Sequence, residues 1–424
     1  MKQRIITLTL LLTGVVIASA QTQKTVTVEN TSELELKAQP VVVDLKPLGE
    51  VKSALVRLNG QEVPCQMDDL DGDGTADELC FLTNLKKKQR QVFSVELSSV
   101  GEPRQYEPQV YAEMLLSNKK IKEENKQDLY ISSLTVDKGT NPYWQLHHHG
   151  PAFENNLVAY RIYFDHRQTV DIYGKYHQGL ELRQTQFYPD SLQKATGFGD
   201  DVLWVGSTLG LGTLRGWNGQ EPVMLEDVAH RTLRIIARGP LRTVVEVIDE
   251  GWNAPTFSTP VTMTTRYTLY AGRRDCMVDV AFRPLTPQPS PLNAPLGPQG
   301  RLPEQERSTL CTGIINVKNS VEFSDREGLR GCWGTDWPVS AKDSAGHKRE
   351  TVGLGICIPR QNIVEELPRD KRNYPFVVTP QNDELHYAIT FCSDNEDFGY
   401  HSADDWFACL KEWKRRLAAV VVVK

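Results

Sequence analysis

The sequence lacks an excess of positive charge, a long hydrophobic run beyond its first residues, and closely spaced cysteines. Its 48 Lys and Arg residues face 54 Asp and Glu residues, for a formal net charge of −6, and this balance argues against a nucleic-acid partner, which selects a basic surface. No apolar stretch after Ala20 is long enough to cross a bilayer as a helix. The eight cysteines contain no Cys-x-x-Cys pair and no spacing typical of zinc sites. We therefore expect no nucleic acid, no membrane contact after signal cleavage and no structural zinc.

The first twenty residues have the features of a secretory signal peptide. Lys2 and Arg4 form a positive start, residues 5–18 are apolar, and the Ala-Ser-Ala tripeptide at 18–20 matches a cleavage site. No cysteine lies near that site, so we expect no lipid anchor. We predict cleavage after Ala20 and a periplasmic or extracellular protein; the alternative is a buried N-terminal strand or helix.

That compartment permits disulfide bonds. Cys65 and Cys80 flank one acidic loop and are the first candidate pair. Cys276 and Cys357 lie in apolar, strand-like runs, which favours buried thiols there.

Short strand patterns dominate the first hundred residues. Segments rich in Val or with alternating hydrophobicity occur at 25–28, 41–43, 54–58 and 92–97. Asn59-Gly60 is typical of a two-residue hairpin turn. We predict a small β-sandwich over residues 21–105.

Longer strand patterns follow, without helical periodicity over any long stretch. They occur at 157–164, 169–173, 202–206, 232–237, 241–249, 261–270 and 277–283. Many antiparallel strands over some 300 residues indicate large stacked sheets. Seven prolines within residues 284–303 interrupt the pattern. This segment is either an irregular surface insertion or a lid over a cleft.

One helix is predicted at the C-terminal end. Ser402 is a candidate N-cap with Asp405 as its capping-box acid. Its apolar face contains Trp406, Leu410, Trp413 and Leu417. The fold class is thus all-β: a small N-terminal β-sandwich followed by a large antiparallel β-supersandwich (residues 106–424) with a C-terminal helix.

Residues 69–78 (DLDGDGTADE) form an acidic loop with calcium chemistry. Alternate carboxylates suit a hard cation, and Gly74 permits the sharp turn. Cys80 stands where a full EF-hand has Glu, so flanking helices are not required. We predict a structural Ca²⁺, with a solvated acidic turn as the alternative. The expected ligands are Asp69, Asp71, Asp73 and Asp77.

The polar candidates for catalysis lie in the middle region. Three histidines at 147–149 lead into LVAYRIYF, in which alternation places Arg161, Tyr163 and Asp165 on the polar side. Alternatively, the histidines lie in a solvent-exposed loop, and Arg161, Tyr163 and Asp165 lie on a solvated sheet face without a catalytic role. Arg pairs with a carboxylate through two hydrogen bonds, and His and Tyr exchange protons. The expected catalytic residues are His148, His149, Arg161, Tyr163 and His230.

Carboxylates and aromatics nearby suggest substrate contacts. Trp204 follows Asp200 and Asp201, as in a sugar-stacking site with an acidic neighbour. The expected substrate-binding residues are Glu154, Asp201 and Trp204. Arg242 and Glu246 share a strand face, which predicts a cross-sheet ion pair.

Five stretches carry a resemblance to a known family. They are PVVVDLKPLG, DDLDGDGTADELCFL, HHHGPAFENNLVAYRIYFDHRQTVDIYGK, GFGDDVLWVGSTLGLG and DDWFACLKEW. With them the sequence resembles the DUF4861 family, uncharacterised secreted proteins of polysaccharide-degrading Bacteroidota. The large β region is also similar to the galactose-mutarotase-like supersandwich of polysaccharide lyases, glycosidase accessory domains and sugar epimerases. These resemblances imply a carbohydrate-related fold and no assigned active site, and the mutarotase His/Glu pattern does not map onto this chain.

Together these features predict a secreted protein, monomeric or weakly dimeric, that acts on oligo- or polysaccharides containing uronic acids. In a β-eliminating lyase, Arg161 would neutralise the carboxylate, a His would take the C5 proton and Tyr163 would protonate the leaving oxygen. A glycoside hydrolase would instead use two opposed carboxylates, drawn from Glu154, Asp200, Asp201 and Glu246. A non-catalytic glycan-binding protein is the third possibility.

Overall fold

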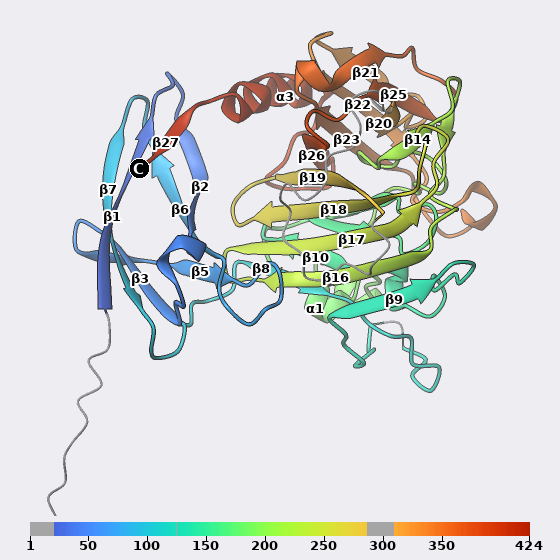
Figure 1. Ribbon diagram of the computed structural model, residues 1–424. Coiled ribbons are helices and arrows are strands. Elements are labelled where there is room, and N and C mark those ends of the chain that lie inside the picture. Colours follow the sequence, from blue (N-terminus) through green and yellow to red (C-terminus); the bar gives the residue numbers. More distant parts are fainter. Residues whose placement is uncertain (1–20, 124, 286–308) are drawn as a thin grey trace, which may run out of the picture.

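The computed structural model describes residues 21–123, 125–285 and 309–424. The predicted signal peptide at 1–20 and most of the Pro-rich segment at 284–303 lie outside the described residues. Strands predominate in the described part, in five sheets, with one longer helix near the C-terminus (Figure 1). The all-β prediction is confirmed. No helix in the described ranges is long and apolar enough to cross a membrane.

Two sheets form the small sandwich, drawn in blue and cyan in Figure 1 apart from the red C-terminal strand. The first runs in the order β27 (Val421–Val423), β1 (Gln21–Asn30), β7 (Arg90–Ser98), β3 (Ser53–Leu58) and β4 (Gln61–Val63), and the second runs β2 (Leu36–Asp44), β6 (Glu78–Leu85) and β5 (Cys65–Asp68). A short 3-10 turn, η1 (Lys46–Leu48), follows β2. The rings of Phe81 and Phe93 meet between the sheets, with centroids 4.7 Å apart. Their burial holds the sandwich together.

The local turn prediction in this sandwich is confirmed. Asn59 and Gly60 connect β3 to β4, and both have positive φ, 51° and 81°. Leu58 pairs with Gln61 across the turn. A two-residue turn with positive φ at both positions matches the twist of the flanking strands.

The candidate Cys65–Cys80 pair does not form a disulfide. Cys65 pairs with Phe81 across β5 and β6, whereas Cys80 pairs with Gln66. Because successive residues of a strand point to opposite faces, the two thiols lie on opposite sides of the sheet. All eight cysteines are free.

Three sheets build the large region. A nine-stranded sheet runs β21 (Val321–Ser324), β22 (Leu329–Asp336), β23 (Glu350–Cys357), β26 (Glu384–Ser393), β19 (Asp275–Pro284), β18 (Val261–Tyr270), β17 (Arg242–Trp252), β16 (His230–Arg238) and β9 (Ser133–Asp137). One five-stranded sheet runs β13 (Asp200–Asp201), β12 (Val170–Gly174), β11 (Ala159–Ile162), β10 (Ala152–Asn155) and β8 (Val110–Glu113). The other runs β15 (Pro222–Val223), β14 (Arg215–Trp217), β20 (Leu310–Ile315), β25 (Asn373–Val378) and β24 (Ile363–Glu366).

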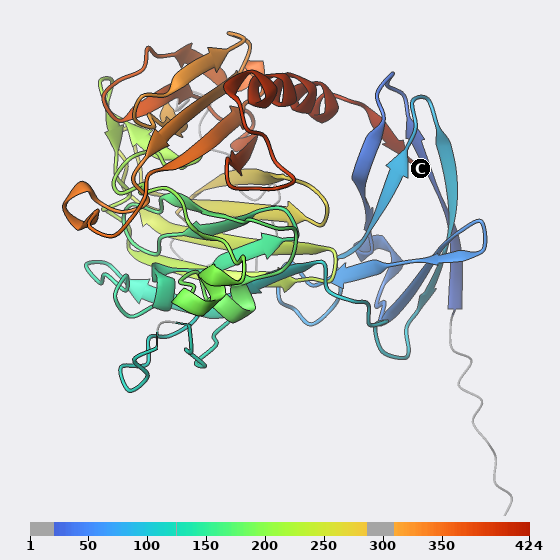
Figure 2. The ribbon, with the colours of Figure 1, turned by 180° about the vertical axis from the view of Figure 1, so that it is seen from behind.

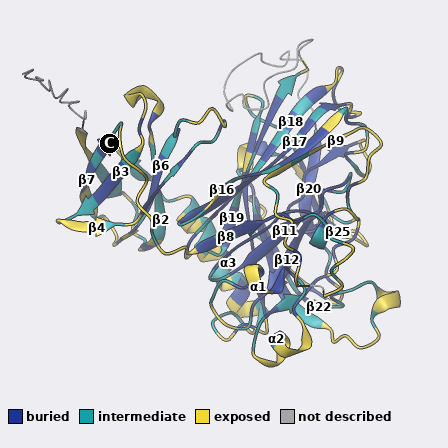
Figure 3. Cartoon of the chain, turned by 90° about the horizontal axis from the view of Figure 1, so that it is seen from below, coloured by how far each residue is buried: buried dark blue, intermediate teal, exposed yellow. Residues whose placement is uncertain are grey.

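One apolar core joins these three sheets. Tyr160 on β11, Val245 on β17 and Phe376 on β25 belong to a single buried cluster. Figure 3 shows the strands of this region as mostly buried and the connecting loops as exposed. Short helical segments occur in the loops: α1 (Leu182–Thr185), α2 (Ser191–Ala195), η2 (His147–His149), η3 (Ala341–Asp343) and η4 (Arg360–Asn362).

The C-terminal helix prediction is confirmed. Helix α3 (Ala403–Leu417) begins at Ser402, whose hydroxyl accepts the Asp405 N–H at 3.2 Å. Trp406 and Leu410 are fully buried over strands β22 and β23. In Figure 1, α3 runs from the large region toward the small sandwich, which the chain re-enters as β27.

Arg242 joins the small sandwich to the large region. Its Nε donates to Asp68 at 2.7 Å and its Nη2 to Glu78 at 2.7 Å, although it was expected to pair with Glu246. Glu246 instead pairs with Arg234 and Arg266. The predicted Arg242–Glu246 pair is wrong because the partners of Arg242 come from strands about 170 residues away in sequence.

Candidate functional site

The three histidines form a strained turn at the entrance to β10. His148 and His149 have φ values of 39° and 69°, a left-handed conformation that is uncommon for residues with a side chain. Gly150 follows because the chain passes close to β11: a Cβ there would lie 1.8 Å from the Ile162 carbonyl oxygen. The turn is therefore fixed by close backbone packing.

Arg161 lies at the centre of a buried polar cluster on the outer face of β11. Its guanidinium pairs with Asp171 on β12 and, at 3.1 Å, with Asp201 on β13. It also donates to the hydroxyl of Tyr188 at 2.9 Å and packs over the ring of Phe187 at 3.9 Å. The Arg161 side chain is only 2% exposed. Its charge is thus already balanced within the protein.

Asp201 is the more accessible of the two carboxylates. Its side chain is 20% exposed, against 1% for Asp171. Burial, and next the neighbouring Asp171 carboxylate, raise the pKa of Asp201 well above its ordinary value, with Arg161 opposing the shift. Two carboxylates compete for one guanidinium, which favours a proton on one of them.

His149 is held as a neutral imidazole of known tautomer. Its Nδ1 lies 3.0 Å from the Tyr143 carbonyl oxygen, and a carbonyl only accepts, so Nδ1 carries the proton and Nε2 is a free lone pair. Burial and the charge of Arg161 lower the pKa of His149 to about 3. Its ring stacks on Tyr143 with centroids 3.8 Å apart. His149 is therefore unprotonated at neutral pH, with Nε2 as a proton acceptor, although a pKa this low makes it a weak base.

His148 points the other way and is fully buried. Its Nε2 lies 3.2 Å from Glu113, whose carboxylate also accepts the Tyr111 hydroxyl at 2.9 Å. Burial lowers the pKa of His148 to about 3 and raises that of Glu113 to about 8. This pair lies beneath the turn and supports it.

The rim of the cluster is aromatic and partly exposed. Trp144 is 76% exposed and meets His149 edge-on, with centroids 5.2 Å apart. His147 and Tyr188 are half-buried and also meet edge-on, at 5.6 Å. Tyr163 is buried and donates its hydroxyl to Asp171 at 3.0 Å. Such a rim offers apolar faces to a sugar ring.

The structure brings His149, Arg161, Tyr163 and Asp201 together in this cluster, with His148 beneath the turn. Figure 2 shows the ribbon from behind, with the short green helices in front. The remaining expected site residues lie elsewhere. His230 is half exposed, and its ring contacts Asp137 on β9 at 2.9 Å. Glu154 is fully buried, pairs with Lys175 at 2.5 Å and accepts the Leu182 N–H at 2.7 Å, so it anchors the start of α1. Trp204 is 49% exposed, three residues after Asp201.

Sequence reasoning missed three members of the cluster: Tyr143, Asp171 and Tyr188. Asp171 had a usable signal, because it pairs with Arg161 across the β11–β12 hairpin. Tyr143 and Tyr188 come from loops whose position depends on tertiary packing, and no local pattern marks them.

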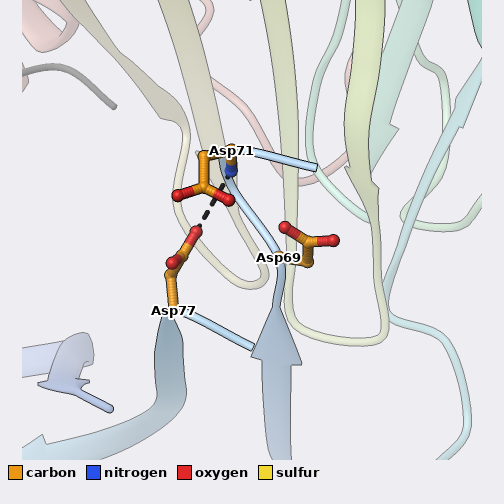
Figure 4. A group of neighbouring side chains, drawn as sticks. All are labelled: Asp69, Asp71 and Asp77. Atoms are coloured by element: carbon orange, nitrogen blue, oxygen red, sulfur yellow. Dashed lines mark hydrogen bonds between the residues drawn. The ribbon is translucent and has the colours of Figure 1, made fainter. Parts of the chain in front are cut away.

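The acidic loop lies apart, between β5 and β6 of the small sandwich. Asp69, Asp71 and Asp77 bring ligand oxygens within 4.8 Å of one another. Figure 4 shows these three side chains. Lys46 reaches into this group, with its Nζ 3.0 Å from Asp71 and 2.9 Å from Asp77. Asp73 instead accepts the Thr75 N–H at 2.7 Å. Three carboxylates suit a hard cation, but here the ammonium of Lys46, whose side chain is 47% exposed, pairs with two of them.

The comparisons with known proteins give a family and two solved structures. A family model described as "Domain of unknown function (DUF4861)" matches residues 28–423. No curated protein matches the chain. A protein in the glycosyl hydrolase family 38 from Enterococcus faecalis is similar, with 10% identity, a TM-score of 0.46, and coverage of 94% of this chain and 47% of that one. An alpha-mannosidase from Enterococcus faecalis V583 is similar too, with 10% identity, a TM-score of 0.44, and coverage of 95% of this chain and 46% of that one. The chain thus spans about half the length of these two proteins.

Proposed function

The chain belongs to the DUF4861 family, and from the polar cluster around Arg161 we propose that it is a carbohydrate-active enzyme that performs acid–base catalysis on a saccharide. The observation that carries the proposal is the state of His149. Its Nδ1–H is held by the Tyr143 carbonyl, its pKa is lowered to about 3, and its Nε2 is left as a proton acceptor beside an exposed tryptophan.

Tyr188 is the acid that best complements this base. Its hydroxyl oxygen accepts a hydrogen bond from Arg161 at 2.9 Å, which polarises the O–H bond, and burial raises its pKa to about 12. It is half-buried, and its ring lies 6.5 Å from that of His149. The buried Tyr163 hydroxyl donates its hydrogen bond to Asp171 instead. Tyr188 therefore takes the acid role first expected of Tyr163.

The carboxylates favour a lyase over a hydrolase. Hydrolysis by two carboxyl groups needs both on opposite sides of one bond. Glu154 and Glu246 are buried in ion pairs. Asp200 and Asp201 are successive residues of β13, so their side chains point to opposite faces. None of these four forms an opposed pair.

We accordingly propose β-elimination on a glycan that contains uronic acid. His149 Nε2 takes the C5 proton, a double bond forms between C4 and C5, and the C4–O bond breaks as Tyr188 protonates the leaving oxygen. Asp201 in its protonated form donates a hydrogen bond to the uronate carboxylate and stabilises the charge that develops there. Arg161 is a positioning residue that holds Asp201 and Tyr188.

The test is turnover of uronic glycans, followed by the ultraviolet absorbance of the new double bond. His149→Gln and Tyr188→Phe should each lower kcat at least ~100-fold, while His386→Gln, an exposed histidine paired with Asp279, should match the wild type. Reducing ends without absorbance would indicate a hydrolase. Tight glycan binding with no product over long incubation would indicate a binding protein and would overturn the proposed reaction.

The export of the chain is a second part of the proposal. The charged, apolar and small-residue segments at 1–20 support it, and a polysaccharide substrate is met outside the cytoplasm. N-terminal sequencing of the protein purified from its native host should start at Gln21. An intact Met1 would overturn this part alone.

A further inference from the structure

A cavity of about 310 Å³ lies at the junction of the small sandwich and the large region. Strand β2 forms one wall through Lys37, the β18–β19 turn forms another through Arg273 and Arg274, and α3 forms a third through Trp413 and Arg416. None of its lining residues belongs to the polar cluster around Arg161. In Figure 1, β2 is the edge of the blue sandwich that faces the large region, below α3.

The cavity is cationic. Arg273 pairs with Asp275 through two bonds, at 2.9 and 2.6 Å, and Arg274 pairs with the buried Glu396 at 2.8 Å. Arg416 pairs with Glu412 within α3. Lys37 is exposed and makes no ion pair within the described ranges. One positive charge is therefore left over, which favours a ligand with a single negative charge.

The wall between these cations is aromatic. Arg274 lies over the rings of Phe398 and Tyr400, 5.4 and 5.8 Å from their centroids. Trp413 is fixed by a hydrogen bond of 3.1 Å from its Nε1 to Asp275. All three rings are half-buried and line the cavity. Fixed ring faces beside cationic donors suit a ring with one apolar face, several hydroxyls and one carboxylate.

We propose that this cavity is a second ligand site, which binds one uronic-acid unit between the small sandwich and the large region. A volume near the lower end of small-ligand pockets fits a single sugar ring. The aromatic wall distinguishes a sugar acid from a spherical anion, because only the sugar has a ring that can stack on it. The inference does not rest on the proposed reaction, since binding here is measurable without turnover.

The experiment is calorimetric titration of the full chain with D-glucuronate, with D-glucose and inorganic phosphate as comparison probes. Glucuronate should bind at least ~10-fold more tightly than glucose, and its affinity should fall as salt is raised. Lys37→Met removes the unpaired charge and keeps the aliphatic stem. It should weaken glucuronate about 3- to 10-fold, with an unchanged melting temperature because Lys37 is exposed.

Two variants serve as controls. Lys52→Met makes the same charge change on an exposed lysine of the small sandwich that does not line the cavity, and should leave the affinity unchanged. His149→Gln alters the polar cluster, so it distinguishes glucuronate bound there from glucuronate bound in the cavity. Loss of binding in His149→Gln with full binding in Lys37→Met would place the ligand in the polar cluster and overturn the second site. Absent glucuronate binding would also overturn it, as would phosphate binding of equal strength.

Discussion

Replacing Arg161 by Lys should destabilise the large region, because one ammonium cannot replace the contacts of this guanidinium. Arg161 contacts Asp171, Asp201 and the Tyr188 hydroxyl while stacking on Phe187. Lys keeps the charge and reaches one carboxylate. It loses a charge-assisted hydrogen bond, worth about 1.5–3 kcal/mol, and a desolvated cation–π contact, worth about 0.5–2 kcal/mol. We expect a net loss of roughly 2–5 kcal/mol.

For a region of about 300 residues, this loss corresponds to a fall in melting temperature of roughly 3–8 °C. Urea denaturation followed by tryptophan fluorescence measures the free energy of unfolding directly. The matched control is Arg57→Lys, an arginine of the small sandwich that is 34% exposed and pairs with Glu96. It should change the free energy of unfolding by less than ~1 kcal/mol.

The outcome that refutes this reasoning is an Arg161→Lys protein as stable as the wild type with strongly reduced affinity for a uronic glycan. Arg161 would then bind the substrate carboxylate itself, as the sequence pattern first suggested. The described contacts leave only Nε of Arg161 without a partner, and that atom is buried.

Three further predictions concern other parts of the molecule. Ca²⁺ should stabilise the small sandwich by about 2.7 kcal/mol at a hundredfold excess over Kd, and so raise its melting temperature. Lys46→Met should strengthen this effect, because the Lys46 Nζ contacts Asp71 and Asp77. A melting temperature that changes with neither Ca²⁺ nor chelator would contradict the calcium site. Arg242→Met should cost roughly 3–5 kcal/mol by leaving Asp68 and Glu78 unpaired, seen by calorimetry as earlier, separated unfolding of the two regions; a single unshifted transition would contradict it. Glu113, whose pKa burial raises to about 8, stabilises the fold fully below its unfolded pKa of about 4.5 and loses that contribution as pH rises to about 8. The free energy of unfolding of Glu113→Gln relative to wild type should therefore rise over that interval, by at most roughly 3–5 kcal/mol, and a difference independent of pH would count against the buried carboxyl.

The parts of the fold that depend on neighbouring residues in the chain are predictable from the sequence. Asn59-Gly60 produces the β3–β4 turn because both residues tolerate positive φ. Ser402 begins α3 because its hydroxyl satisfies a free backbone N–H of the first turn. Neither signal requires knowledge of distant contacts.

The burial of Arg161 depends on segments far along the chain and was not predictable. Alternation in residues 157–164 suggests one core face and one wet face. The inner face does pack into the core, through Tyr160 and Ile162. The outer face is covered as well, by a separate cluster that contains Leu182 and Phe187. A helix as short as α1 leaves no periodic pattern from which this cover could be inferred.

The polar cluster around Arg161 contains destabilising features, and these are the strongest structural argument that it has a function. His147 Nε2, His148 Nδ1 and Arg161 Nε are buried without hydrogen-bond partners in the described residues, and each such atom costs about 1–3 kcal/mol. The left-handed backbone of His148 and His149 adds strain in the same turn. The Arg242 junction, in contrast, satisfies its buried charges with short hydrogen bonds. Because a purely structural cluster would gain stability by relaxing these features, their concentration beside an exposed aromatic rim favours a site maintained for binding and proton transfer.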